Sequence, residues 1–255
     1  MKVTLLGTGT SQGTPVIGCG CEVCRSSDPR DHRLRTSALL SIDNQNIAID
    51  CGPDFRQQML RADVSSLDAI LITHEHNDHV AGMDDVRPFN FFQRRDMPVY
   101  ATVRVAAELR RRFAYAFGPD AYPGAPRLLL QEIQKDTPIQ IGSTSIVPIE
   151  VMHGSLPVLG FRVGSFTYLT DVKTISEAEL EKVMGTEILI INALYHTPHP
   201  THLHLEGALE LIERIGPRKA YLTHIAHSMG RRCDVSPALP PGVELGWDGL
   251  EIVVD

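Results

Sequence analysis

The stretch Thr73-His74-Glu75-His76-Asn77-Asp78-His79 directly follows an apolar run, Leu67–Ile72, that predicts a buried strand. Histidine offers a neutral nitrogen ligand, and aspartate adds negative charge and can bridge two ions. His74 and His76 lie two positions apart, so in extended chain they point to the same side and can share one ion. Asp78 and His79 follow a turn and can hold a second ion nearby. The sequence therefore predicts a divalent-metal centre at the end of this strand.

The composition and net charge of the chain limit the classes of protein to which it can belong. The chain has 255 residues, of which 43% are hydrophobic and 22% charged, as in a globular protein with a sizeable core. Its net charge of -7 disfavours a general nucleic-acid binder. No apolar run reaches the ~20 residues that span a bilayer, and Met1–Gly7 is too short for a signal peptide. We expect a cytoplasmic protein with reduced cysteines and no membrane partner.

A second candidate metal site lies near the start of the chain. Cys19, Cys21 and Cys24 form a C-x-C-x-x-C cluster. Thiolates this close together suit zinc, which prefers a tetrahedral shell of sulfur and nitrogen. A closed structural site needs a fourth ligand from elsewhere in the chain, and histidine is the most plausible one. Cys51 and Cys233 stand apart from this cluster.

Ligand-type residues also follow several later strands. His153, Asp171 and His224 each come directly after an apolar run that reads as a strand. Asp50 ends another predicted strand, where it either approaches the metal centre from behind or stabilises a turn. Strand ends that converge on one place are how sheet proteins build an active site. His196 and His199 have no supporting motif and are predicted to be surface-loop residues.

These residues together resemble the metallo-β-lactamase superfamily, whose H-x-H-x-D-H motif matches the stretch His74–His79. The later single ligands occur in the expected order. The resemblance implies one α/β domain over residues 1–255, a four-layer αββα sandwich with two mixed β-sheets. It also implies one ion held by His74, His76, His153 and Asp171, and another held by Asp78, His79, Asp171 and His224, with Asp171 bridging.

The cysteine cluster and the ending Thr223–His227, T-H-I-x-H, resemble the PhnP family of cyclic phosphodiesterases. This resemblance implies a structural zinc held by Cys19, Cys21, Cys24 and His227. The phosphate-contacting histidine of that family, a candidate general acid, matches His202, and His204 is the alternative two positions later.

The implied activity is that of a metal-dependent phosphodiesterase. Two divalent ions, Mn or Zn, would activate a hydroxide for in-line attack on a small cyclic or nucleotide-like phosphodiester. Asp78 would orient the nucleophile or hold its ion, and His202 would protonate the leaving oxygen. Family relatives often dimerise, so a homodimer is open.

Other functions share the same metal motif. One alternative is a tRNA 3′-processing endoribonuclease, which the acidic charge disfavours. Another is a non-catalytic or biosynthetic relative of the PQQ-pathway type, which predicts lost ligands, whereas all seven are present here. Hydrolysis of a thioester or lactam is also open. The segment Arg87–Arg95, rich in phenylalanine and arginine, is expected to be a lid, an interface, or plain core with solvated charge.

Overall fold

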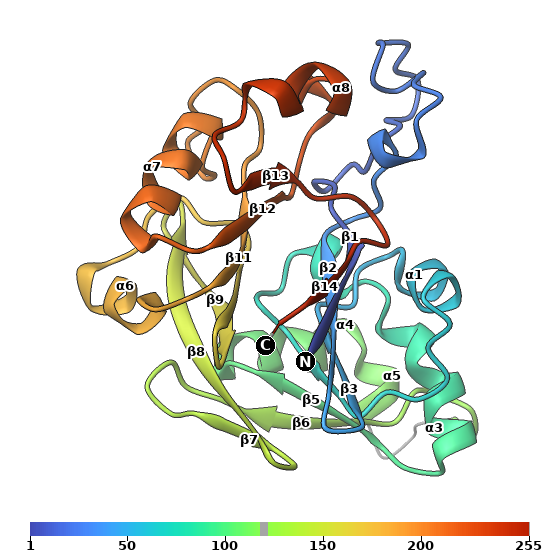
Figure 1. The fold of residues 1–255 in the computed structure, drawn as a ribbon. Helices are drawn as coiled ribbons and strands as arrows, with labels where there is room; N and C mark the ends of the chain where they lie inside the picture. Colours follow the sequence, from blue (N-terminus) through green and yellow to red (C-terminus); the bar gives the residue numbers. More distant parts are fainter. Residues whose placement is uncertain (118–121, 255) are drawn as a thin grey trace.

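The computed structural model describes residues 1–117 and 122–254 and contains two seven-stranded β-sheets packed face to face (Figure 1). The first sheet has the order β14-β1-β2-β3-β4-β5-β6 and the second β13-β12-β11-β10-β9-β8-β7. Each sheet has an antiparallel half and a parallel half. The predicted α/β sandwich of two mixed sheets is confirmed.

The strands of the first sheet are β1 (Lys2–Gly7), β2 (Ser37–Ile42), β3 (Gln45–Ile49), β4 (Ala69–Leu71), β5 (Met97–Ala101), β6 (Leu128–Glu132) and β14 (Glu251–Val253). Those of the second are β7 (Ile139–Ile141), β8 (Thr144–His153), β9 (Leu156–Val163), β10 (Phe166–Leu169), β11 (Ile188–Asn192), β12 (Lys219–Thr223) and β13 (Val243–Leu245).

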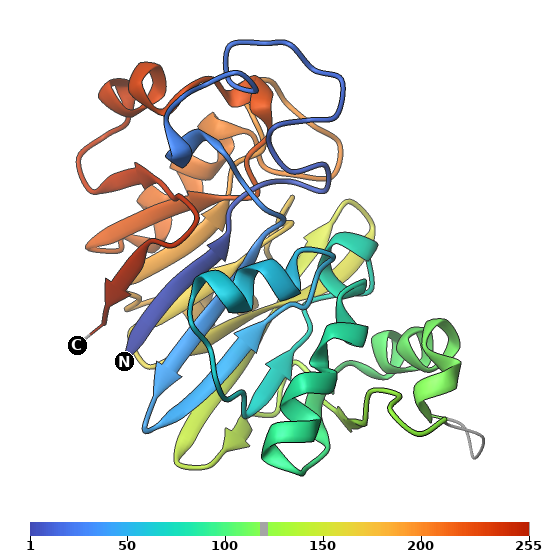
Figure 2. The ribbon, with the colours of Figure 1, turned by 90° about the vertical axis from the view of Figure 1, so that its right-hand side faces the viewer.

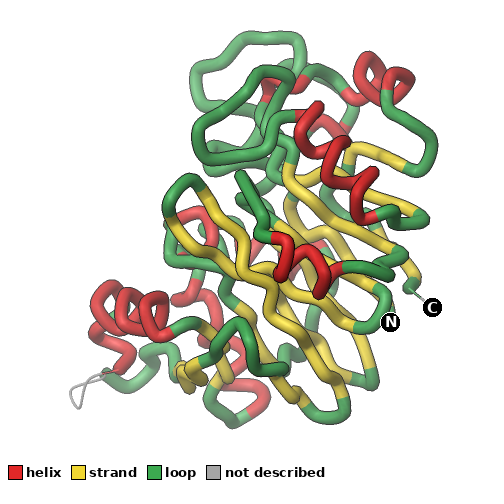
Figure 3. Tube along the Cα trace, turned by 90° about the vertical axis from the view of Figure 1, so that its left-hand side faces the viewer, coloured by secondary structure: helices red, strands yellow, loops and turns green. Residues whose placement is uncertain are grey.

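The helices cover the outer faces of the sheets (Figures 2 and 3). They are α1 (Phe55–Arg61), α2 (Asn77–Val80), α3 (Arg87–Gln93), α4 (Val103–Arg112), α5 (Ala114–Phe117), α6 (Glu177–Val183), α7 (Leu205–Ile215) and α8 (Arg232–Val235). Within the described residues, none of them is long and apolar enough to cross a membrane.

Three apolar clusters hold these layers together. One lies between the sheets and includes Leu5 and Tyr168, both fully buried. A second joins the first sheet to α1 and α4, and a third joins the other sheet to α6 and α7. Helix α7 shows the sequence basis of this layering, because Ala208, Leu211, Ile212 and Ile215 fall on one buried face.

The two chain ends lie side by side in the first sheet (Figures 1 and 2). Strands β1 and β14 are antiparallel, with Lys2 opposite Val253. The Met1 ammonium donates to the Val254 carbonyl at 3.0 Å, and the Val254 N–H donates to the Met1 carbonyl at 2.9 Å. At the other end of β1 the chain enters the loop where Gly9 bridges to Ile225, next to His224.

Candidate metal centre

The seven side chains predicted as ligands come together where strands of both sheets end. The loop after β4 carries His74 and His76, and α2 carries Asp78 and His79. From the second sheet, β8 ends at His153, while Asp171 and His224 follow β10 and β12. Strand ends far apart in the sequence therefore supply a single site.

The first group of ligand atoms comes from His74, His76, His153 and Asp171, all within 4.8 Å of one another. The His74 Nε2 and His76 Nδ1 atoms are 2.9 Å apart. The Asp171 Oδ2 atom lies 3.9 Å from His74 Nε2 and 4.0 Å from His153 Nε2. Two nitrogens bound to one ion at about 2.1 Å are separated by roughly 3 Å, so this spacing suits a shared ion.

The second group comes from Asp78, His79 and His224. The Asp78 Oδ2 atom lies 3.3 Å from His79 Nε2 and 3.6 Å from His224 Nε2. The Asp171 Oδ1 atom is 3.6 Å from His79 Nε2 and 3.4 Å from His224 Nε2. The two oxygens of Asp171 thus face different groups, which is the arrangement a bridging carboxylate requires.

Three residues of the site have left-handed backbone: Asp50 (φ 66°), Asp171 (φ 57°) and His224 (φ 52°). Such conformations cost non-glycine residues roughly 1–3 kcal/mol and persist only where the surroundings impose them. Behind Asp171, the buried Asn192 side chain provides this support. Its Oδ1 accepts from the Val172 N–H at 2.7 Å, and its Nδ2 donates to the Val172 carbonyl at 3.1 Å.

Asp50, which the sequence left between two roles, lies fully buried behind His79. Its carboxylate is 2.7 Å from His79 Nδ1 and accepts from the N–H and hydroxyl of Thr73 at 2.9 Å. This contact leaves His79 Nε2 facing the site. His153 is oriented in the same way, because its Nδ1 lies 2.9 Å from the Thr201 carbonyl. Hydrogen-bonded partners of this kind fix the orientation of metal-binding histidines.

A close approach of two loops positions Asp78. A Cβ added at Gly52 would lie 2.0 Å from the Asp78 carbonyl oxygen, so only glycine fits there. The Cys51 N–H donates to the His79 carbonyl at 2.8 Å and joins the same two loops.

The electrostatics of the centre suit divalent cations. Burial favours a higher pKa for Asp171, but His224 and His79 outweigh it and hold the pKa of that carboxyl well below its usual range. Burial, reinforced by His79, lowers the pKa of His74 well below its usual value, so its imidazole is neutral and able to bind metal. The Nε2 atoms of His79 and His224 are buried without a hydrogen-bond partner in the described part of the chain, and both lie beside Asp78 and Asp171. Buried polar atoms are normally paired, so these donor atoms fit a metal that completes them.

The cysteine cluster forms a second group with His227. The His227 Nδ1 atom lies 3.4, 3.3 and 3.5 Å from the sulfurs of Cys19, Cys21 and Cys24. A tetrahedral zinc with usual bond lengths separates sulfur from nitrogen by about 3.5 Å, which these distances match. The Cys24 backbone N–H, helped by His227, lowers the pKa of Cys21 to about 6, whereas burial raises the pKa of Cys24 to about 11. The segment Thr223–His227 therefore contributes to both clusters.

The other histidines differ in their relation to the site. The buried His202 ring lies 4.4 Å from the His153 ring and 4.8 Å from the His224 ring, and its Nδ1 is 3.8 Å from Asp171 Oδ2. His204 lies at the N-cap of α7, with its Nε2 3.7 Å from Glu206. His196 is exposed and contacts the Met229 carbonyl, as expected of a loop residue. The ring of His199 is 5.2 Å from that of His202, so this residue lies beside the site.

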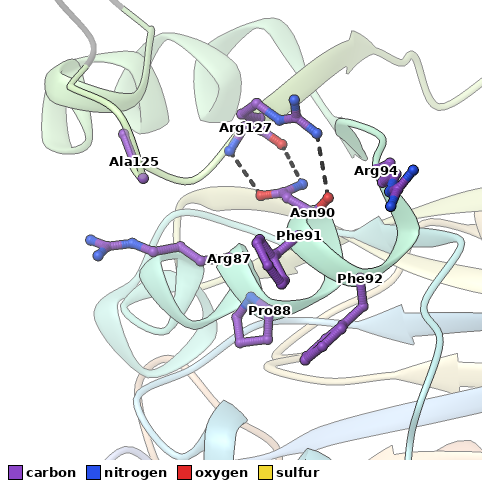
Figure 4. A pocket seen from close by; sticks show the side chains of 9 residues that line it. Arg87, Pro88, Asn90, Phe91, Phe92, Arg94, Ala125 and Arg127 are labelled. Carbon is purple, nitrogen blue, oxygen red and sulfur yellow. Dashed lines mark hydrogen bonds between the residues drawn. The ribbon is translucent and has the colours of Figure 1, made fainter.

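A separate cavity of about 840 Å³ lies between α3 and the loop 122–127 (Figure 4). Phe91 and Phe92 on α3 are 77% and 75% exposed, and Asn90 joins α3 to Arg127 through hydrogen bonds of 2.9 and 3.0 Å. The metal-centre residues do not line this cavity. In the segment Arg87–Arg95, Phe89 is buried in the core while Phe91 and Phe92 are exposed, and the cavity that the segment lines is separate from the centre.

Known proteins match most of the chain. The model of the β-lactamase superfamily domain matches residues 45–225. The crystal structure of a diphosphatase from the PhnP family superposes with a TM-score of 0.92 and 38% identity, covering 98% of this chain and 96% of that one.

Two curated proteins match over different parts of the chain. An octanoyltransferase of Porphyromonas gingivalis is 44% identical over 257 residues, which is all of this chain and 52% of that protein. A ribonuclease Z of Methanococcus maripaludis is 27% identical over 195 residues, or 74% of this chain and 55% of that protein. The chain thus spans about half the length of these relatives.

Proposed function

Because the chain belongs to the metallo-β-lactamase superfamily and to its PhnP family, we propose that it is a metal-dependent hydrolase of small phosphodiesters. The substrate class is a cyclic or nucleotide-like diester. The observation that carries the proposal is the position of His202, whose buried ring lies against two metal-centre histidines. The solved PhnP-family structure that matches nearly the whole chain is a diphosphatase, which supports phosphoryl chemistry in general rather than the diester in particular.

The metal centre would hold two divalent ions, Mn or Zn, with His74, His76 and His153 on one side and Asp78, His79 and His224 on the other. When bound, such ions activate water and neutralise charge on phosphoryl oxygens. Asp171 contributes a carboxylate oxygen to each side, and Asp50 keeps His79 in its orientation. A structural zinc would be held by Cys19, Cys21, Cys24 and His227.

His202 is the proposed acid and phosphate-contacting residue. Burial, together with His224, lowers the pKa of His202 to about 3, so its ring is neutral at neutral pH in the free protein. A phosphoryl group brings negative charge beside the ring, which favours the protonated form. His202 would then donate a proton to the leaving oxygen.

Acyl chemistry is the second candidate, because the curated relative with 44% identity is named an octanoyltransferase. This chain covers only 52% of the octanoyltransferase. The name therefore describes a longer protein, and acyl transfer by the present chain is a proposal of its own. RNA 3′-end processing, suggested by the ribonuclease Z relative, is disfavoured by the net charge of -7.

A side-by-side assay tests the proposal. The protein would be supplied with Mn²⁺ or Zn²⁺ and incubated with bis(p-nitrophenyl) phosphate, a phosphoric anhydride, an octanoyl thioester, a lactam and a precursor tRNA. We expect cleavage of the phosphodiester. Cleavage of the thioester without any phosphodiester cleavage would overturn the proposal in favour of acyl chemistry, and cleavage of the tRNA alone would favour the nuclease.

Replacing His202 separates its role from metal binding. We expect His202→Ala to lower kcat for the diester by about 10²–10⁴-fold, the usual contribution of a general acid, while the metal content stays unchanged. His204→Ala is the matched control, because the His204 side chain lies at the start of α7 and contacts Glu206. Loss of metal from the His202→Ala protein would make His202 a ligand and contradict its proposed role.

A further inference from the structure

The backbone of the loop that carries His74 and His76 is anchored at its two ends, where the Thr73 carbonyl accepts from the Leu159 N–H and the His76 carbonyl accepts from the His79 N–H, both at 3.0 Å. Strand β4 ends at Leu71, and α2 begins at Asn77. Between them, the backbone N–H groups of His74, Glu75 and His76 donate no hydrogen bond to any described residue. His76 is also exposed, so packing restrains it little. Between these anchors, a side-chain contact supports the segment in which His76 Nδ1 lies 2.9 Å from His74 Nε2.

That support comes from Arg104, the second residue of α4. One guanidinium nitrogen of Arg104 forms a close ion pair with Glu75 Oε1, and the other donates to the Pro157 carbonyl at 2.7 Å. Glu75 lies between the two histidines in sequence. Pro157 is on β9, opposite Met152 and next to the pair formed by Leu156 and His153. One arginine thus joins the two chain segments that supply the first group of ligands.

We propose that the Arg104–Glu75 pair is a positioning clamp for the metal centre, which keeps His76 and His153 aligned on one ion. The inference rests on the proposed metal centre but not on the substrate. A planar guanidinium suits this task, since its nitrogens can reach a carboxylate and a carbonyl at the same time. The side chain of Glu75 is only 17% exposed, so its charge is partly shielded from solvent by the same contact.

The clamp acts on one half of the centre. The second group of ligands is held by other contacts, namely Asp50 on His79 and the tight approach of Gly52 to Asp78. Arg112, at the far end of α4, donates to Asn77 Oδ1 at 2.8 Å and secures the start of α2. Loss of Arg104 should therefore weaken the first group of ligands, His74, His76 and His153, and leave the second in place.

Manganese titration tests this without any substrate. Mn²⁺ prefers nitrogen and oxygen ligands to thiolates, so on protein whose cysteine cluster is filled with zinc it reports on the histidine centre. Free Mn²⁺ would be counted by its electron paramagnetic resonance signal. We expect two bound equivalents in the unaltered protein and, in Arg104→Gln, a 10- to 100-fold weaker affinity for one of them, the usual effect of losing an orienting partner.

Three further variants sharpen the test. Arg110→Gln, on the same helix but paired with the exposed Glu132, should bind manganese like the unaltered protein. Arg104→Lys should restore part of the affinity, because an ammonium can contact Glu75 or Pro157 but rarely both. The Glu75→Gln/Arg104→Gln double variant should be no weaker than the worse single variant, since the pair acts as one unit.

The outcomes separate the two proposals. Two equivalents bound normally by Arg104→Gln would overturn the clamp and leave the metal centre intact. If Arg104→Gln weakened the affinity for both manganese equivalents equally and lowered the melting temperature, the clamp would also be overturned. Such a result would indicate a general loss of structure. Failure of the unaltered protein to bind manganese would overturn the proposed manganese centre itself.

Discussion

The Asp171→Asn protein is expected to lose at least about 10³-fold in kcat/KM for bis(p-nitrophenyl) phosphate, or about 4 kcal/mol of transition-state stabilisation. Asp171 is the only residue whose two oxygens face both groups of ligands in the described structure. An asparagine keeps the shape but removes the charge and turns an NH₂ towards one group. Both halves of the centre should therefore bind metal more weakly.

Metal analysis and kinetics on the same sample check this expectation. Asp136→Asn is a suitable control, because Asp136 is 72% exposed and pairs with Lys182, away from the metal centre. Zinc at the cysteine cluster should remain in both proteins. An Asp171→Asn protein that kept full metal content and activity would show that the carboxylate does not bridge.

The second large effect is expected on stability. Cys21→Ser should lower the zinc content by one equivalent and reduce the melting temperature, since a structural zinc contributes directly to folding free energy. Outside this cluster, the segment that carries the cysteines has few anchors. One is Asp31, which accepts from the Arg232 N–H at 2.8 Å, and another is Glu22, 3.7 Å from Arg231. The metal content of the histidine centre should stay the same.

Fluorescence offers a local measurement of this change. Trp247 is the single tryptophan of the chain, and the Arg232 guanidinium lies 4.5 Å from its ring. Its emission should shift in Cys21→Ser and stay constant in Cys233→Ser, whose thiol is exposed and outside the cluster. Equal zinc content in the two serine variants would disprove the structural site.

The structure brings the residues of the two predicted clusters together, and the sequence signals for these clusters are local. The H-x-H-x-D-H spacing and the cysteine spacing each lie within a few positions, and His153, Asp171 and His224 follow recognisable strands. The contacts that support the ligands could not be predicted in this way. Arg104 and Glu75 are 29 residues apart, and Asn192 is 20 residues from Val172, so only the folded chain brings them together.

The two candidate acids illustrate the same limit at short range. His202 and His204 differ by two positions, and the sequence favoured the first only through resemblance. The difference lies in where α7 begins. Because the helix starts at Leu205, His204 occupies its N-cap, while His202 precedes it and lies against His153 and His224. A shift of one residue in a helix start is below what sequence patterns can resolve.

The pairing of β1 with β14 has a consequence for modular architecture. Both chain ends emerge at one edge of the first sheet, and the six residues of β1, roughly 20 Å of strand, separate them from the loops around the metal centre. Another domain could be fused at either end, or this unit inserted into a host loop, without obstructing access to the metals. This chain covers 52% of the octanoyltransferase relative, so that protein has further length beyond the matched part.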